Sequence, residues 1–259
     1  MSTYVMSDLH GCYDDFQAML EKIGFSENDQ LIIAGDLIER GPQNYEMLRW
    51  IEECPQNILL LRGNHEEEFM QNVVLMSRIC RDLGWDPASA EYTGRIYRSI
   101  KGRVRHFDYY KSITGLLQEN AVTLRNLQGW ALLFQTWPYQ YRTTVNGKDY
   151  IIVHAGYIED LNVLPDRREY AGAAEFYLYA REEAYSYGGL PHTTVIAGHT
   201  PTMIPSVFTY NKGRVYRYYD EEKDCTYYDI DCGAVFKYWG EAESRMACIR
   251  LEDESITYI

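Results

Sequence analysis

The chain has 259 residues and a formal net charge of −13, and 46% of its residues are hydrophobic. This length fits one large domain or two small ones with a substantial core. The acidic balance disfavours nucleic acid and acidic membrane surfaces as partners, because like charges repel at long range. No apolar run is long enough for a membrane-spanning helix, and the N-terminus lacks the basic start and apolar middle of a signal peptide. We therefore expect a cytoplasmic protein with reduced cysteines.

The first third of the chain alternates between short apolar strands and amphipathic helices. Strands are predicted over three apolar runs, at residues 3–7, 31–34 and 58–61. The helices between them are predicted over residues 12–23 and 42–51, with Pro42 in the first turn of the second. Alternation of this kind indicates a largely parallel sheet with right-handed crossovers.

The next segment, at about residues 66–135, has mainly helical spacing and no strong strand. One apolar stripe includes Val73, Met76 and Cys80, and a second helical stretch includes Ile113 and Leu116. No Pro/Gly/Ser-rich linker flanks the segment. We therefore predict a helical insertion lying over the sheet, within a single domain that spans residues 1–259.

Strand patterns return after Trp137-Pro138. Residues 139–145 and 149–153 flank Asn146-Gly147, which is a strong hairpin signal. A helix is predicted over residues 171–185 and a buried strand over 194–197. Short strands are predicted beyond it, near residues 214–219, 226–230, 246–251 and 255–258.

Five segments at the ends of predicted strands share one composition: metal-binding side chains beside glycine or alanine. Four of the six histidines of the chain lie in them. The segments are Ser7-Asp8-Leu9-His10-Gly11, Gly35-Asp36-Leu37-Ile38-Glu39-Arg40-Gly41, Arg62-Gly63-Asn64-His65-Glu66, Val153-His154-Ala155-Gly156 and Ala197-Gly198-His199-Thr200. Taken singly, such residues are more often caps or turn residues. Taken together, they predict a metal-dependent hydrolytic site at one edge of an α/β sheet.

The candidate ligands combine nitrogen and oxygen donors and include no thiolate. They are Asp8, His10, Asp36, Asn64, His154 and His199. Asp36 can bridge two ions through its two oxygens. This donor set suits Mn²⁺, Fe or Zn better than a soft metal or a magnesium site built only of oxygens. We expect two divalent ions, with Mn²⁺ as the first choice and Fe or Zn as alternatives.

Such a centre has a recognisable hydrolytic chemistry. Two ions about 3.5–4 Å apart would hold a bridging hydroxide that attacks phosphorus. Arg40 and Arg62 stand beside the ligand motifs, and their planar guanidinium groups match phosphate oxygens. His65 is the candidate general acid for the leaving group, and Glu39 is the nearest carboxylate that could orient it.

The five segments resemble the phosphoprotein phosphatase branch of the calcineurin-like metallophosphoesterases. The family pattern is GDxHG, GDxVDRG, GNHE, HGG or HAG, and a late GH, and the match runs from Met6 to His199. The resemblance, to the bacterial and phage type of serine/threonine protein phosphatase, implies an α/β fold. This fold is the calcineurin-like α/β/β/α sandwich, in which two mixed β-sheets are flanked by helices.

The resemblance also implies a role for each site residue. Asp8, His10 and Asp36 would hold one ion, and Asp36, Asn64, His154 and His199 the other. Arg40 and Arg62 would bind phosphate, and His65 would protonate the leaving group. The family supplies one more arginine from a helix between the last two histidine motifs. The segment 179–182 is similar to that helix, which assigns this phosphate-binding role to Arg181.

Glu39 departs from the family pattern, because protein phosphatases carry aspartate at this position. The related symmetrical diadenosine tetraphosphate hydrolases have a non-acidic residue there and usually read GNHD, whereas this chain reads GNHE. We therefore expect a phosphatase of phosphoserine and phosphothreonine in proteins, with a phosphoprotein or phosphopeptide as partner. The alternative is a symmetrical diadenosine tetraphosphate hydrolase that acts on a dinucleoside polyphosphate. A remote alternative is a catalytically silent module that binds phosphoproteins.

A local basic cluster stands out in this acidic chain. It comprises Arg95, Arg98, Lys101, Arg103 and Arg105. Its simplest interpretation is a solvated helix face. The functional interpretation is a docking surface for an acidic peptide or a polyphosphate.

Overall fold

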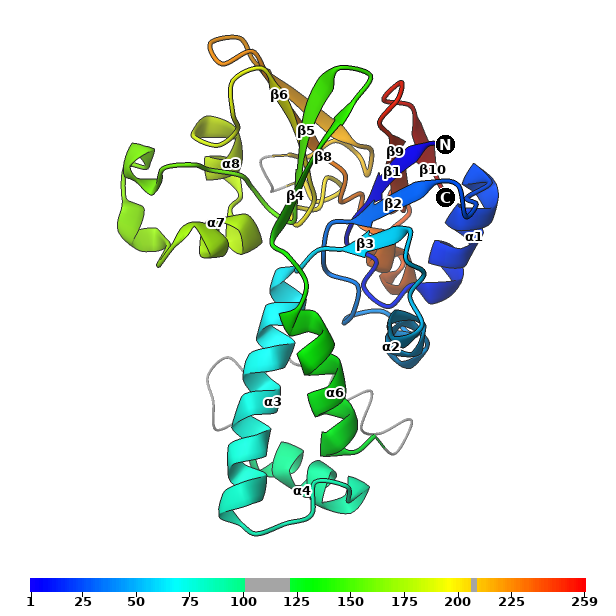
Figure 1. Cartoon of the computed structure of the whole chain (residues 1–259), viewed down its shortest axis with the longest axis vertical. Coiled ribbons are helices and arrows are strands. Elements are labelled where there is room, and N and C mark those ends of the chain that lie inside the picture. Colours follow the sequence, from blue (N-terminus) through cyan, green and yellow to red (C-terminus); the bar gives the residue numbers. More distant parts are fainter. Residues whose placement is uncertain (101–121, 206–208) are drawn as a thin grey trace.

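Two five-stranded β-sheets lie face to face between helices (Figure 1). The structure is a computed structural model, and it describes residues 1–100, 122–205 and 209–259. Sheet A has the strand order β10-β9-β1-β2-β3, and sheet B has the order β4-β5-β6-β8-β7. The predicted α/β sandwich of two mixed sheets flanked by helices is confirmed.

Sheet A contains the three strands expected in the first third of the chain. Its strands are β1 (Thr3–Met6), β2 (Gln30–Ile33), β3 (Ile58–Leu60), β9 (Ala247–Arg250) and β10 (Ile256–Tyr258). β1 to β3 are parallel, because α1 (Tyr13–Ile23) and α2 (Asn44–Glu52) form the crossovers between them. β9 and β10 are antiparallel additions. The helix after Pro42 begins later than expected, so Pro42 precedes its cap residue Gln43 instead of lying in its first turn.

Sheet B begins with the predicted hairpin. Its strands are β4 (Gln140–Val145), β5 (Lys148–Val153), β6 (Thr193–Ala197), β7 (Tyr216–Asp220) and β8 (Cys225–Asp229). Asn146 and Gly147 join the first two and both have positive φ, at 51° and 78°. Such a two-residue turn matches the twist of the strands that it joins. β5, β6 and β8 are parallel, so their carboxyl ends lie at the same edge.

The helix expected over residues 171–185 is two helices, α7 (Ala173–Tyr179) and α8 (Glu182–Ser186). The single-helix prediction is wrong because a contact distant in sequence competes with the helical ladder. The carbonyl of Tyr177 accepts the backbone N–H of Ala155 at 2.8 Å, and the chain is extended at Ala180. The break brings Arg181 to the start of the second helix.

Three apolar layers hold the sandwich together. In β1, Tyr4 and Met6 pack toward α1 and α2, whereas Val5 packs between the sheets against residues such as Ile152 and Ile196. This alternation follows the two-residue period of a strand. The third layer lies between sheet B and the helices α7 and α8.

The described part of the segment after β3 consists mainly of helices. Its helices are α3 (Asn64–Asp82), α4 (Ala90–Ile100) and α6 (Leu124–Gln135). α3 and α6 lie side by side and extend away from both sheets, not over them (Figure 1). The stretch expected around Ile113 and Leu116 lies outside the described residues. That the whole chain is one domain with this segment inserted stays a prediction.

Short 3₁₀ helices complete the described structure. They are η2 (Leu161–Val163), η3 (Arg167–Glu169) and η4 (Ala234–Trp239). Among the described helices, none combines the length and the apolar composition that crossing a bilayer requires.

Candidate metal centre and catalytic site

The carboxyl ends of parallel strands from both sheets meet at one place. Within sheet A, the backbone N–H of Asp8 donates to the carbonyl of Gly35 at 3.1 Å, and that of His10 donates to the carbonyl of Asp36 at 2.9 Å. Across the two sheets, the N–H of His199 donates to Oδ2 of Asp8 at 3.0 Å. The loops that follow β1, β2 and β6 are therefore fixed to one another.

Four acceptor atoms converge at the first candidate ion position. Nδ1 of His154 faces the carbonyl of Ala34 at 2.9 Å and must carry the proton, so its Nε2 presents a lone pair. That Nε2 lies 2.9 Å from Oδ1 of Asn64, 3.2 Å from Nδ1 of His199 and 3.4 Å from Oδ2 of Asp36. Ligands about 2.1 Å from one ion are spaced about 3.0–3.4 Å apart. The four residues therefore fit a divalent cation, which removes the repulsion among their lone pairs.

The second candidate position shares Asp36. Nδ1 of His10 faces the carbonyl of Ile38 at 3.1 Å, so its Nε2 also presents a lone pair. This Nε2 lies 3.8 Å from Oδ1 of Asp8 and 3.7 Å from Oδ2 of Asp36. The same oxygen of Asp36 faces both positions, as a bridging ligand requires. Nη1 of Arg40 donates to Nε2 of His10 at 3.0 Å and uses the lone pair that an ion would take.

Burial sets the charge state of these groups. It raises the pKa of Asp8, with the charge of Asp231 as second cause, and it raises the pKa of Asp36, with the charge of Asp8 as second cause. It lowers the pKa of His10 and His199 well below the usual value. The pKa of His154 falls to about 3 for the same reason. The imidazoles are therefore neutral and able to coordinate, and a divalent cation would favour the charged carboxylates.

His65 contacts Glu39 inside the site. Nδ1 of His65 pairs with Oε2 of Glu39, and both side chains are buried. Nε2 of His65 lies 3.8 Å from Oδ2 of Asp36 and has no hydrogen-bond partner among the described residues. Burial, followed by the charge of Arg40, lowers the pKa of His65 to about 3. The charge of Glu68 acts in the opposite direction and raises the pKa of His65. A carboxylate paired with Nδ1, as Glu39 is, favours the imidazolium form on general grounds.

The backbone is strained where the ligands lie. Asp8, His10, Asp36 and His199 have φ angles of 51°, 44°, 54° and 70°, and Glu39 and Arg40 are also in the left-handed region. Non-glycine residues rarely adopt this conformation, and it persists only where the surrounding structure enforces it. One enforcing contact is the hydrogen bond from the N–H of Glu39 to Oδ1 of Asn44, at 2.6 Å. Strain of this kind is concentrated at functional sites.

Two glycines allow the loops to approach the ligands. A Cβ at Gly198 would lie 2.0 Å from Oδ2 of Asp8, and a Cβ at Gly63 would lie 2.2 Å from Oδ1 of Asp36. Real Cβ atoms do not come this close to other heavy atoms. The glycines beside the ligand residues are therefore required by close packing at these two places.

Glu66 is a site residue that sequence reasoning did not assign. Its buried carboxylate accepts three backbone N–H groups, from Asp36 at 2.9 Å, Leu37 at 2.8 Å and Gly63 at 2.8 Å. It thereby joins the loop after β2 to the start of α3 and holds the bridging residue Asp36 in place. The final Glu of the Gly-Asn-His-Glu segment was the available signal, but two of its three partners, Asp36 and Leu37, lie about 30 residues away along the chain.

Arg181 lies at the rim of the site. Its Nη1 is 3.3 Å from Oγ1 of Thr200 and 3.5 Å from the carbonyl of His199. The residue is exposed. The structure therefore brings Arg181 and Arg40 next to the candidate ligands, and their predicted role toward phosphate stays a prediction.

Arg62 is placed differently. Its Nη1 donates to Oε2 of Glu67 at 3.0 Å and to the hydroxyl of Tyr139 at 2.8 Å. Its Nη2 donates to the carbonyls of Gln135 and Trp137 at 2.8 and 3.3 Å. Within the described part of the chain only Nε lacks a partner. The guanidinium group thus joins α3, α6 and the start of β4, and its predicted role toward phosphate stays a prediction.

The predicted basic cluster is described only in part. Arg95 pairs with Glu91 of the same helix at 2.7 Å, and both are exposed. Arg98 is exposed as well. Lys101, Arg103 and Arg105 lie outside the described residues. Because Arg95 pairs with Glu91, we interpret its position as part of a solvated helix face.

Comparison with known proteins supplies the family. The model of a family described as calcineurin-like phosphoesterase matches residues 1–232. Two solved structures that the fold resembles over the whole chain are one provisionally described as a diadenosine tetraphosphatase and a serine/threonine phosphatase from Saccharomyces cerevisiae. Their TM-scores are 0.54 and 0.56, they cover 92% and 79% of those chains, and both are 15% identical to this chain. At this identity the likeness concerns the fold alone.

Curated relatives match a shorter stretch. The chain is 38% identical over 80 residues to a Haemophilus ducreyi protein and 48% identical over 67 residues to a Wigglesworthia glossinidia brevipalpis protein. Both are named "Bis(5'-nucleosyl)-tetraphosphatase, symmetrical". The matches cover 30% and 26% of this chain, and 30% and 25% of the relatives. The chain therefore spans less than a third of the length of these curated relatives.

Proposed function

Because the chain belongs to the calcineurin-like phosphoesterase family, we propose that it hydrolyses phosphoric monoesters at a two-metal centre, with phosphoserine and phosphothreonine in proteins as substrates. The chain is a phosphoesterase by its family. The single observation that carries the choice of a monoester is the buried pair of His65 and Glu39.

The pair of His65 and Glu39 matters most for a basic leaving group. A serine or threonine alkoxide has a high pKa and must be protonated as it leaves, whereas a nucleoside diphosphate is a stable anion at neutral pH. Glu39 fixes Nδ1 of His65 and stabilises the imidazolium, which leaves Nε2 to hold the proton that is donated. Burying the carboxylate of Glu39 beside His65 costs desolvation free energy. A site that must protonate an alkoxide leaving group gives this cost a purpose.

The substrate phosphate is held by the remaining polar groups of the site. Arg40 and Arg181 lie next to the ligand residues and supply planar donors for the equatorial oxygens. The ions would be held by Asp8, His10 and Asp36 on one side and by Asp36, Asn64, His154 and His199 on the other, with Mn²⁺ as the proposed metal. When bound, two such ions supply a water of lowered pKa and positive charge against the phosphoryl oxygens.

A symmetrical dinucleoside tetraphosphate is the second candidate substrate. The names of the curated relatives favour it. The same centre could attack an anhydride phosphorus, and Arg40 and Arg181 could hold a polyphosphate. About 70% of the chain lies outside those matches. The relatives therefore support the type of reaction, phosphoester or anhydride hydrolysis, better than they support a particular substrate.

The cytoplasm is the proposed compartment. All six cysteines are free thiols, and five of them are buried, including Cys12 and Cys248. Free thiols fit a reducing compartment.

A parallel assay distinguishes the candidate functions. The full chain with Mn²⁺ is given a phosphoserine peptide, diadenosine tetraphosphate and an aryl phosphate, and kcat/KM is measured for each. We expect kcat/KM for the peptide to exceed kcat/KM for the dinucleotide at least tenfold. The variant His65→Gln should lose most of its activity toward the peptide. A tenfold preference for the dinucleotide would replace the first candidate by the second. Phosphate binding without hydrolysis of any substrate would instead favour the silent binding module.

A further inference from the structure

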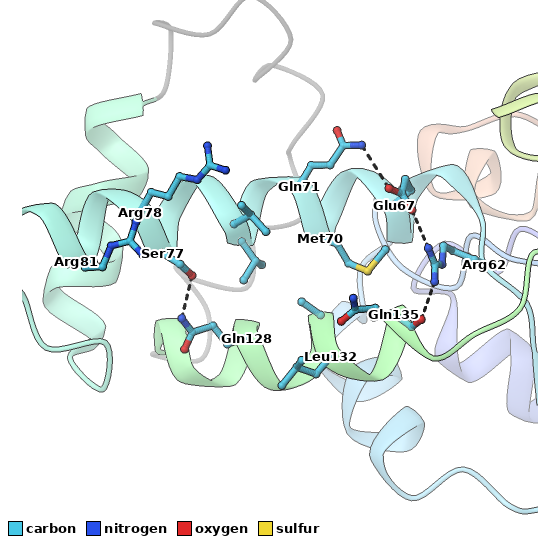
Figure 2. A pocket seen from close by; sticks show the side chains of 13 residues that line it. Arg62, Glu67, Met70, Gln71, Ser77, Arg78, Arg81, Gln128, Leu132 and Gln135 are labelled. Carbon is cyan, nitrogen blue, oxygen red and sulfur yellow. Dashed lines mark hydrogen bonds and ion pairs between the residues drawn. The ribbon is translucent and has the colours of Figure 1, made fainter. Parts of the chain in front are cut away.

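A groove runs along the helices that extend from the sheets. It lies between α3 and α6, has a volume of about 710 Å³, and is named here the α3–α6 groove. Figure 2 shows its lining, with Arg62 at the end near the site and Arg78 and Arg81 at the far end. It lies outside the metal centre, and only its base, at Val73, belongs to the first of the cores described above.

The floor of the α3–α6 groove is apolar and open to solvent. Met70, Val74 and Leu132 line it, and the exposed fractions of Val74 and Leu132 are 51% and 64%. Adjacent large apolar side chains of this exposure favour a surface that is covered in use. The same helices bury their other faces, for example through Phe69 and Phe134, whose rings are 5.3 Å apart.

The charges around the floor are mainly positive. The lining contains three arginines and one glutamate, and the glutamate, Glu67, is paired with Arg62. This leaves two positive charges, Arg78 and Arg81, at the far end. Nε of Arg81 is 3.8 Å from Asp82 in an exposed pair, and Arg78 forms no ion pair with any described residue. In a chain of net charge −13, this end of the groove favours a negatively charged occupant.

The groove is continuous with the candidate site through one helix. α3 begins with Asn64 and His65 and then lines the groove with Met70, Val74 and Arg78. Fourteen residues separate Asn64 from Arg78, which is about 21 Å along a helix at 1.5 Å per residue. An extended peptide covers this distance with about six or seven residues. A substrate chain that leaves the metal centre along α3 therefore reaches Arg78 and Arg81 about six to eight residues from its phosphorylated residue.

We propose that the α3–α6 groove docks the segment of a phosphoprotein substrate that flanks the phosphorylated residue. The segment is extended, places apolar side chains on the floor at Val74 and Leu132, and presents acidic side chains to Arg78 and Arg81. This inference rests on the proposed function, since it assumes a peptide substrate. It adds a preference for acidic residues at a stated distance from the phosphoserine.

The test uses the full chain with Mn²⁺ and three phosphoserine peptides of equal length. One carries two glutamates six to eight residues from the phosphoserine, one carries them at three residues, and one carries two lysines at the far position. The double variant Arg78→Glu/Arg81→Glu is expected to raise KM for the first peptide about 5- to 30-fold, because each exposed ion pair contributes up to about 1 kcal/mol. KM for the lysine peptide should fall, because the new glutamates attract its lysines. KM for the peptide with glutamates at three residues and for an aryl phosphate should change by less than about twofold.

Two further variants keep the test specific. Arg125→Glu changes an exposed arginine on α6 that does not line the groove, and it should leave every KM unchanged. Arg78→Lys/Arg81→Lys keeps the charges and should preserve the preference. Binding of the first peptide is also followed by fluorescence anisotropy, independently of turnover.

The outcomes separate the two proposals. If the first peptide binds and loses binding in the glutamate variant but is not hydrolysed, the proposed function fails and the groove assignment stands. If the peptides are hydrolysed and the glutamate variant leaves all KM values alike, the groove assignment is wrong. Concentration-dependent dimerisation that is abolished by Leu132→Asp would also overturn it, because a second copy would then occupy the groove.

Discussion

Oε2 of Glu39 pairs with Nδ1 of His65 in the interior of the candidate site. Glu39 comes from the loop after β2, and His65 comes from the first turn of α3. Glutamate is one methylene longer than the aspartate expected here, and φ at Glu39 is 81°, so the backbone accommodates the longer side chain through a left-handed turn. On the proposed mechanism, this contact makes Glu39 a positioning residue for His65, the proposed proton donor.

Glu39→Gln is expected to lower kcat about 10- to 100-fold for a phosphoserine peptide and less than about threefold for an aryl phosphate. Glutamine cannot stabilise the imidazolium form of His65, and only the alkoxide leaving group depends on that proton. Steady-state kinetics with leaving groups of graded pKa measures the difference. Glu46→Gln, at an exposed position of α2, is the control and should change neither substrate. Equal losses for both leaving groups would refute the positioning role.

Glu66→Gln is expected to weaken Mn²⁺ binding about 10- to 100-fold, as is typical when a group that orients a ligand is removed. The carboxylate accepts three N–H groups, and glutamine replaces one acceptor oxygen by a donor that faces them. Calorimetric titration with Mn²⁺ measures the affinity. Glu53→Gln, on the surface at the end of α2, should bind Mn²⁺ as the wild type does. An unchanged affinity in Glu66→Gln would mean that the backbone alone holds Asp36.

Gly198→Ala and Gly129→Ala should have opposite effects on stability. The added Cβ at Gly198 would lie 2.0 Å from Oδ2 of Asp8, whereas at Gly129, in the exposed face of α6, nothing lies within 4 Å. We expect Gly129→Ala to raise the free energy of unfolding by about 0.5–1 kcal/mol, since alanine favours a helix. Gly198→Ala should lower it and also reduce Mn²⁺ binding. Urea unfolding of both variants provides the measurement, and a tolerated Gly198→Ala would contradict the close approach.

The stability of the protein should fall at alkaline pH, in part through Cys248. Burial in β9 raises the pKa of the Cys248 thiol to about 12, whereas an unfolded thiol titrates near 8.5. Between these values the unfolded state has lost the proton and the folded state has kept it. The unfolded state then binds fewer protons, so the free energy of unfolding falls as pH rises, by about 1.4 kcal/mol per pH unit for this group.

Cys248→Ala isolates that contribution. The variant is less stable near neutral pH because a buried side chain is truncated, but its free energy of unfolding should decline less steeply between pH 9 and about 11. Urea unfolding under reducing conditions gives both slopes. Parallel slopes for the two proteins would show that the thiol does not titrate differently on folding.

The strands were predicted to within about two residues because buried parallel strands form continuous apolar runs, as in Leu31–Ile33. The break in the helix expected over residues 171–185 was not predicted, because it depends on a hydrogen bond between Tyr177 and Ala155, which are 22 residues apart. The direction in which α3 and α6 extend could not be predicted from the sequence either. An amphipathic stripe specifies that a helix packs, but not against which partner.

The candidate site divides in the same way. The candidate ligand residues could be named from the sequence because histidines and aspartates after strands follow a repeated pattern along the chain. The orientation of Arg62 was not readable, because its partners Tyr139, Gln135 and Trp137 lie more than 70 residues away. Glu66 was missed for a similar reason: its role appears only when the loop after β2 folds onto the start of α3.

The central claim is that the site binds two divalent ions that share Asp36. Equilibrium dialysis of the full chain against Mn²⁺, with the bound metal counted by mass spectrometry, tests it most directly. We predict two ions per chain in the wild type, one in His154→Ala, and none in Asp36→Ala, whose carboxylate faces both positions. A single ion in the wild type, or two ions retained by Asp36→Ala, would contradict a shared centre.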